Sequence, residues 1–354
     1  MNRAVALADR LAMPALKLLA AINVLFFLSF LLVAAFAVGQ ARAETPVCTG
    51  VDLMQALRKD DPAAAGKIEE DARATPNGSG LLWKIEKAGL GTSYLFGTMH
   101  MTDPRVTALP DAAQAAYDAS ATVVIETTDV LDQAEMMAAI MQKPELMMFT
   151  DQTTLKSLLS PEDAEAVEAA LSERGIPLAS VAKMKPWMLS AMVALPACEM
   201  ARKAAGLPVL DVKLAQDAEA AGKELRGLET VTDQLEAMAS LPMEFHIRGL
   251  VDTLKLGDRM DDVVETMISL YVQGEVGAIW PLFKVVLPDG EKEDSYAAFE
   301  EVMVTARNKT MAAEAEPILQ KGGAFVAIGA LHLPGEEGVV ELLRKAGYTV
   351  TAAN

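Results

Sequence analysis

Two stretches of the chain decide its fold, YLFGTMH at residues 94–100 and FVAIGALH at residues 325–332. Each runs a short apolar segment into a Gly-x-x-His motif. Around them, short apolar segments typical of strands alternate with amphipathic segments typical of helices. This alternation predicts an α/β fold with a central mixed sheet flanked by helices.

Six segments are expected to form the strands of that sheet. They are residues 81–87, 92–97, 121–125, 224–228, 324–328 and 348–351. Residues 58–80 precede them and are charged, Ala-rich and broken by Pro and Gly, which favours a surface lead-in to the fold.

Residues 131–206 contain no strand candidate and are interpreted as a helical, Met-rich insertion or cap. Within it, Ser160 followed by Pro161 is a typical helix start, and Gly175 a typical stop. The methionines are either soft filler of a helical core or the lining of an adaptable apolar groove. They are Met136, Met137, Met141, Met147, Met148, Met184, Met188, Met192 and Met200.

The N-terminus has the pattern of an export signal. Three basic residues precede an apolar run at 18–38, and Ala41-Arg42-Ala43 follows as a small-x-small cleavage site. We therefore expect a signal peptide at 1–43 and a mature domain at 44–354 in the periplasm or cell envelope. The run is long enough to span a bilayer, so an uncleaved N-terminal anchor is the alternative.

The chain has two cysteines, Cys48 and Cys198, and both lie in the part expected to be exported. Two thiols in an oxidising compartment usually pair, which predicts one disulfide. The alternative is that each is buried separately as a small apolar side chain.

Composition excludes one class of partner. The 354 residues carry a formal net charge of −18, which repels a phosphate backbone. We therefore expect no nucleic-acid partner, and contact with a membrane only through the N-terminal segment if it is not cleaved.

Polar residues follow four of the predicted strands: His100, Glu126, Glu229 and His332. Side chains at the carboxyl ends of strands in an open α/β sheet converge on one crevice. Two imidazoles with carboxylates can hold a divalent metal and leave a position open for water. The alternative is that these histidines are structural hydrogen-bonding groups.

The glycine in each Gly-x-x-His motif is expected to let the backbone turn sharply and approach a ligand closely. The third histidine, His246, lies in a helical context and is interpreted as structural. No Gly-x-Ser-x-Gly, Gly-rich phosphate loop or His-Glu-x-x-His motif occurs, which disfavours those enzyme classes.

These motifs resemble the TraB/GumN family, which includes the Tiki metalloproteases and is more distantly similar to the ChaN and erythromycin esterase groups. The resemblance covers nearly all of the mature chain, through residues 81–100, 222–230, 307–312 and 329–350. It implies an α/β fold of two pseudo-equivalent halves. It also implies a site made of His100, His332, Glu126 and Arg307.

The leading hypothesis is an exported metal-dependent hydrolase, in the first place a peptidase, that uses Mn, Co or Zn on a peptide or protein substrate. His100, His332 and Glu126 would be metal ligands, with Glu126 alternatively the general base. Arg307 would stabilise oxyanion charge, although by sequence alone it could be a surface ion pair.

Three further residues are expected to contact either the substrate or the metal ligands: Thr98, Glu229 and Asn308. Glu229 could instead be a buried anchor for its loop. Two other functions stay open: a non-catalytic protein that binds metal, haem or peptide, and a metal-free hydrolase resembling the esterases.

Overall fold

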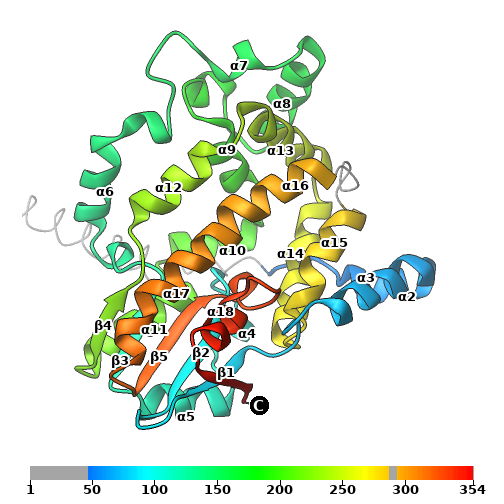
Figure 1. The fold of residues 1–354 in the computed structure, drawn as a ribbon. Coiled ribbons are helices and arrows are strands. Elements are labelled where there is room, and N and C mark those ends of the chain that lie inside the picture. Colours follow the sequence, from blue (N-terminus) through cyan, green and yellow to red (C-terminus); the bar gives the residue numbers. More distant parts are fainter. Residues whose placement is uncertain (1–46, 287–292, 354) are drawn as a thin grey trace, which may run out of the picture. The chain divides into compact units, whose positions relative to one another are not determined.

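One mixed β-sheet organises the part of the chain that the computed structural model describes, residues 47–286 and 293–353. Within these residues it has six strands in the order β4-β3-β5-β2-β1-β6 (Figure 1). They are β1 (Leu82–Glu86), β2 (Ser93–Thr98), β3 (Thr122–Ile125), β4 (Glu224–Gly227), β5 (Ala324–Gly329) and β6 (Thr349–Ala352). Each lies within one residue of its expected bounds, and the α/β fold is confirmed.

The four strands β4, β3, β5 and β2 run parallel, whereas β1 pairs antiparallel with both β2 and β6. In the β2–β5 register, Gly97 lies opposite Ile328 and Thr98 opposite Gly329. The two Gly-x-x-His motifs therefore leave the sheet side by side, at the carboxyl edge where ligands bind in open α/β sheets.

Helices cover both faces of the sheet because its strands are apolar on both sides. One face packs Phe96 and Phe325 against helices through Tyr117 and Leu214. The other face packs Leu95, Val124 and Val326 against helices through residues such as Met311 and Leu343. Because the parallel strands are buried, they hold the polar residues that follow them in fixed positions at the carboxyl edge of the sheet.

The helices that pack in the core on the first face include α4 (Pro104–Thr107), α5 (Asp111–Ala119), α11 (Leu210–Ala220), α14 (Arg259–Val272) and α15 (Ile279–Val286). Those on the second face are α17 (Ala306–Leu319) and α18 (Val339–Lys345). Further helices are α12 (Val231–Ser240), α13 (Met243–Leu256) and α16 (Glu293–Glu300). A π-helical turn, Glu301–Thr305, joins α16 to α17.

Residues 131–206 contain α6 (Gln133–Gln142), α7 (Leu155–Leu158), α8 (Pro161–Glu173), α9 (Pro186–Val193) and α10 (Ala197–Ala204). Ser160 caps α8 by accepting from the Asp163 amide, and Gly175 follows the helix with a φ of +70°. Leu155, Leu171 and Leu189 form a separate core with Leu250 of α13.

The methionines of this segment do not all fill that core. Met184 and Met192 pack against it, but Met137, Met141, Met148 and Met200 are exposed. The filler interpretation is therefore wrong for these four, because leucine and valine supply the buried volume.

The expected surface lead-in is wrong as well. It contains the last three residues of α2 (Leu53–Asp60) and the whole of α3 (Pro62–Ala74), and Ile68 of α3 is fully buried in the main core. Pro62 does not break the helix but starts it, with Asp61 accepting from the Ala64 amide as the cap.

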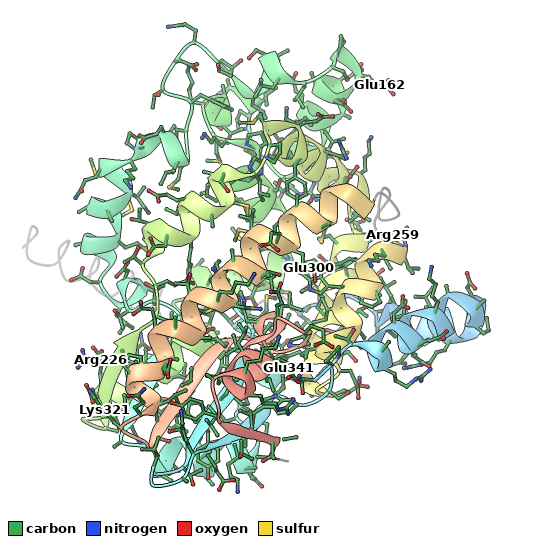
Figure 2. All side chains as sticks on the ribbon, in the orientation of Figure 1. Glu162, Arg226, Arg259, Glu300, Lys321 and Glu341 are labelled. Carbon is green, nitrogen blue, oxygen red and sulfur yellow. A yellow bond between two sulfur atoms is a disulfide. The ribbon has the colours of Figure 1, made fainter. Side chains whose placement is uncertain are left out.

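The edge strand β4 is protected by charge. Arg226 lies on the outer rim of the sheet (Figure 2) and forms a 2.6 Å ion pair with Glu224 on the same strand. Charged side chains on an edge strand discourage pairing with another chain.

The expected leader at 1–43 lies outside the described residues. Across the described ranges, no helix combines the length and the apolar character needed to cross a membrane.

Cys48 and Cys198 form the expected disulfide, which ties the start of the described chain to α10 across a sequence separation of 150 residues. In the chain-entropy model a loop of that length contributes about 5 kcal/mol. We expect the Cys48→Ser/Cys198→Ser variant to lose several kcal/mol of unfolding free energy, measured by urea denaturation. A variant as stable as the parent would show that the cross-link adds nothing to stability.

Candidate active site

The two motif histidines and Glu126 meet at the carboxyl edge of the parallel strands. His100 follows β2, Glu126 directly follows β3, and His332 closes the short 3₁₀ turn after β5. The Nε2 atom of His100 lies 4.0 Å from Glu126 Oε1, and Nε2 of His332 lies 3.9 Å from the same oxygen. The polar side chains that follow three strands thus lie close together at the carboxyl edge of the sheet.

The motif glycines serve close packing and not a sharp turn. Gly97 lies inside β2, and Gly329 has a φ of −52°, which any residue adopts. A Cβ on Gly97 would lie 2.7 Å from Leu333 Cδ1, and one on Gly329 would lie 3.0 Å from Glu126 Oε1. The expected sharp turn is therefore wrong, and the expected close approach to a ligand stays a prediction.

His332 is buried and held at one ring nitrogen. Asn308 Oδ1 lies 2.6 Å from His332 Nδ1, while Asn308 Nδ2 donates to the Glu337 carbonyl at 2.8 Å. Because that donation fixes the amide, its oxygen faces the ring and Nδ1 must carry the proton. Burial lowers the pKa of His332 to about 4, although the negative charge of Glu126 acts to raise it. The ring is therefore neutral, with the lone pair of Nε2 facing Glu126.

His100 is held more loosely, since its side chain is 58% exposed. Its Nδ1 lies 3.8 Å from Oδ2 of Asp211, the second residue of α11. Thr98 donates to the other oxygen of Asp211 at 2.6 Å. Burial raises the pKa of Asp211, partly offset by His100 and the Thr98 hydroxyl.

Glu126 is an ionised carboxylate whose oxygens are both occupied. Oε1 accepts from the Gly329 amide at 2.7 Å, and Oε2 accepts from Arg307 at 2.8 Å and from Gln234 at 3.2 Å. Burial alone would raise the pKa of Glu126, but the charge of Arg307 and the positive charges that His332 and His100 carry at low pH hold it down at about 2.

Arg307 bridges two glutamates. It lies at the start of α17, directly after the π-helical turn, and such turns are frequent at functional sites. Besides Glu126 it binds Glu229 through Nε and Nη2, and Nη1 donates to the Met303 carbonyl at 3.2 Å. Burial would lower the pKa of Arg307, but Glu229 and Glu126 raise it.

Glu229 lies deeper than the histidines. Its side chain is 3% exposed and accepts from Gln234 at 2.8 Å as well as from Arg307. This is the geometry of the buried anchor, one of the two roles that the sequence left open for Glu229. His246, interpreted as structural, is buried on α13, and burial lowers its pKa.

The structure thus gathers every residue that the sequence singled out for the site. Thr98 and Asn308 contact Asp211 and His332 respectively. Sequence reasoning missed Asp211 and Gln234, and the only signal for Gln234 was its place in the helix that follows Glu229. Across residues 47–286 and 293–353, no three His, Cys, Asp or Glu side chains stand close enough to enclose a metal ion in this conformation.

Comparison with known proteins adds to this geometry. The model of the TraB/PrgY/gumN family matches residues 81–352. The chain belongs to the TraB/PrgY/gumN family. That match contains all six strands and every residue described above at the site. The family resemblance drawn from the motifs is confirmed.

Curated relatives of this TraB/PrgY/gumN protein are named metalloproteases. Metalloprotease TIKI2 of Danio rerio is 25% identical over 76% of this chain and 60% of the relative. Metalloprotease TIKI1 of Homo sapiens is 25% identical over 77% of this chain and 61% of the relative. The matches therefore span about three fifths of those relatives' length. No solved structure matches.

Proposed function

We propose that this chain is a metal-dependent peptidase that acts outside the cytoplasm. The observation that carries the proposal is the approach of two imidazole Nε2 atoms to one oxygen of Glu126, at 4.0 and 3.9 Å. The relatives named metalloproteases support the same reaction class.

The residues present fit a divalent ion in their donor chemistry. His332 is neutral and presents an unprotonated Nε2, which is the form that ligates metals. Its Nδ1 is held by Asn308, as the outer nitrogen of a metal-bound histidine usually is. His100 is exposed on the open side of the site, so its ring is free to move the short distance that a common ion requires.

In this proposal His100, His332 and Glu126 hold the ion. A divalent ion in such a site polarises a carbonyl and lowers the pKa of water. Mn, Co and Zn all accept imidazole and carboxylate ligands, and the donor set does not single out one of them.

The low pKa of Glu126 supports one of its two expected roles. A carboxylate with a pKa of about 2 has little tendency to take a proton at neutral pH. We therefore assign Glu126 as a ligand and not as the general base. Arg307 keeps it ionised and in place, and a direct contact between Arg307 and substrate would first have to break one of its bonds to the two glutamates.

Export is part of the proposal because the chain carries a disulfide. Cleavage after Ala43 would leave Cys48 in the mature chain, and its pairing with Cys198 suits an oxidising compartment.

The direct test is peptide cleavage by the mature chain on a peptide library, before and after removal of metal with a chelator. We expect cleavage that stops on chelation and returns with Mn²⁺, Co²⁺ or Zn²⁺. Cleavage that survives chelation would favour a metal-free hydrolase. Stoichiometric metal binding with no cleavage of any peptide would favour a binding protein.

Gly329 offers a test of how closely Glu126 must approach. The Cβ of Gly329→Ala would meet Glu126 Oε1 at 3.0 Å and His332 Cδ2 at 3.4 Å. We expect Co²⁺ affinity to fall about tenfold or more, as it does when the support of a ligand is disturbed, with native circular dichroism. Gly249→Ala, where nothing lies within 4 Å of the added Cβ, is the control. Equal affinity in both variants would contradict the placement of Glu126.

A further inference from the structure

We infer that Asp211 is a positioning residue for His100. Its Oδ2 accepts a hydrogen bond from His100 Nδ1 and thereby turns His100 Nε2 toward Glu126. The part of this inference that concerns metal affinity rests on the proposed function, whereas the hydrogen bond itself does not.

The first observation is a buried carboxylate oxygen with nothing to bind. The Asp211 side chain is 9% exposed, and its Oδ2 has no hydrogen-bond partner among the described residues. A buried polar atom left unpaired costs about 1–3 kcal/mol. Thr98 fixes Oδ1, so the carboxylate cannot swing round to a different partner. Oδ2 therefore stays aimed at the His100 ring.

The second observation is the symmetry between the two histidines. Each ring presents Nε2 to Glu126 Oε1 and is approached at Nδ1 by an acceptor from a helix. For His332 this acceptor is Asn308 of α17, and for His100 it is Asp211 of α11. Each histidine of the repeated Gly-x-x-His motif thus has a helix residue beside its Nδ1 atom, which the sequence alone did not show.

The third observation explains why His100 needs such support. Packing holds His332, whose side chain is 7% exposed, but the His100 side chain is 58% exposed. The 3.8 Å between His100 Nδ1 and Asp211 Oδ2 is longer than a hydrogen bond. Because the ring faces solvent, rotation about its side-chain bonds can close that distance.

The inference is tested first without metal, by nitrogen-15 NMR of the histidine rings in the chelator-treated mature chain. The whole chain has only three histidines, so the spectrum is simple and single variants assign it. At a pH where the rings are neutral, His100 should carry its proton on Nδ1. In Asp211→Ala the proton should shift toward Nε2, while the His332 signals stay unchanged.

Two more variants make this test decisive. Thr98→Val, which removes the hydroxyl that fixes Asp211, should shift the His100 tautomer in the same direction by a smaller amount, and it serves if Asp211→Ala does not fold. Asp217→Asn on the same helix, where Asp217 pairs with Lys213 on the surface, should change nothing. The inference would be overturned if the His100 proton lies on Nε2 in the parent chain, or if neither Asp211→Ala nor Thr98→Val changes the His100 tautomer.

The second readout is Co²⁺ binding, followed by its visible absorption. Asp211→Ala should weaken Co²⁺ binding about 10- to 100-fold while the absorption bands keep their parental pattern. Unchanged affinity would overturn the positioning role, and a changed band pattern would overturn it in favour of direct ligation by Asp211. If the parent chain binds no divalent ion, the proposed metal site fails, and the tautomer measurement still decides the Asp211–His100 contact.

Discussion

Replacing His332 by alanine should lower peptide turnover about 1,000-fold or more, and His100→Ala should do nearly the same. The double variant should be little worse than either single one. The reason is that two remaining ligands rarely retain a labile ion, so removing either imidazole empties the same site. Turnover of the three variants on one peptide checks this non-additivity.

The control for this prediction is the third histidine. His246 lies buried on α13, and its ring contacts Phe245 instead of any residue of the site. His246→Gln should therefore keep its turnover, and circular dichroism should stay native-like in all four variants. Losses that add up across the single variants would show that His100 and His332 act separately.

Replacing Arg307 by methionine should destabilise the fold by about 3–5 kcal/mol. Arg307 is 13% exposed at its side chain and lies between Glu126 and Glu229, which are 7% and 3% exposed. Removing the guanidinium leaves two buried carboxylates facing each other without a cation. Urea denaturation of the metal-free chain measures the loss.

A surface ion pair provides the matched control. Arg226 pairs with Glu224 on the exposed edge strand, and Arg226→Met should change the unfolding free energy by less than about 1 kcal/mol. The loss of unfolding free energy in Arg307→Lys should lie between those of Arg226→Met and Arg307→Met. Lysine keeps the positive charge but cannot make the paired hydrogen bonds of the planar guanidinium. An Arg307→Met variant as stable as Arg226→Met would contradict the structural role given to the bridge.

The sequence predicted the sheet and the residues at its carboxyl edge because both follow from local patterns. Apolar runs mark β2, β3 and β5, and parallel strands bring whatever follows them to one edge. The same rule predicts that His100, Glu126 and His332 lie together. Glu229 follows the same rule but comes from the edge strand β4, two residues after its end, and there it binds Arg307.

The supporting residues depend on tertiary packing, which no local pattern encodes. Asp211 and Gln234 lie on helices, and only the docking of α11 and α12 against the strand ends brings them to His100 and Glu126. The same limit explains why residues 58–80 were wrongly expected to lie on the surface. Ile68 is a single isoleucine in a charged, Ala-rich helix, and no local pattern shows that it is buried. Helix starts were more readable, as Ser160 shows, because a cap is a local feature.

The most direct test of the central claim is X-ray absorption spectroscopy of the mature chain loaded with one equivalent of Zn²⁺. If His100 and His332 share one ion beside Glu126, the spectrum should fit two imidazoles with oxygen ligands, with Zn–N distances of about 2.0–2.1 Å. It should fit a single imidazole in His100→Ala and in His332→Ala wherever any metal remains. A spectrum of the parent chain with one imidazole or none would contradict the shared site.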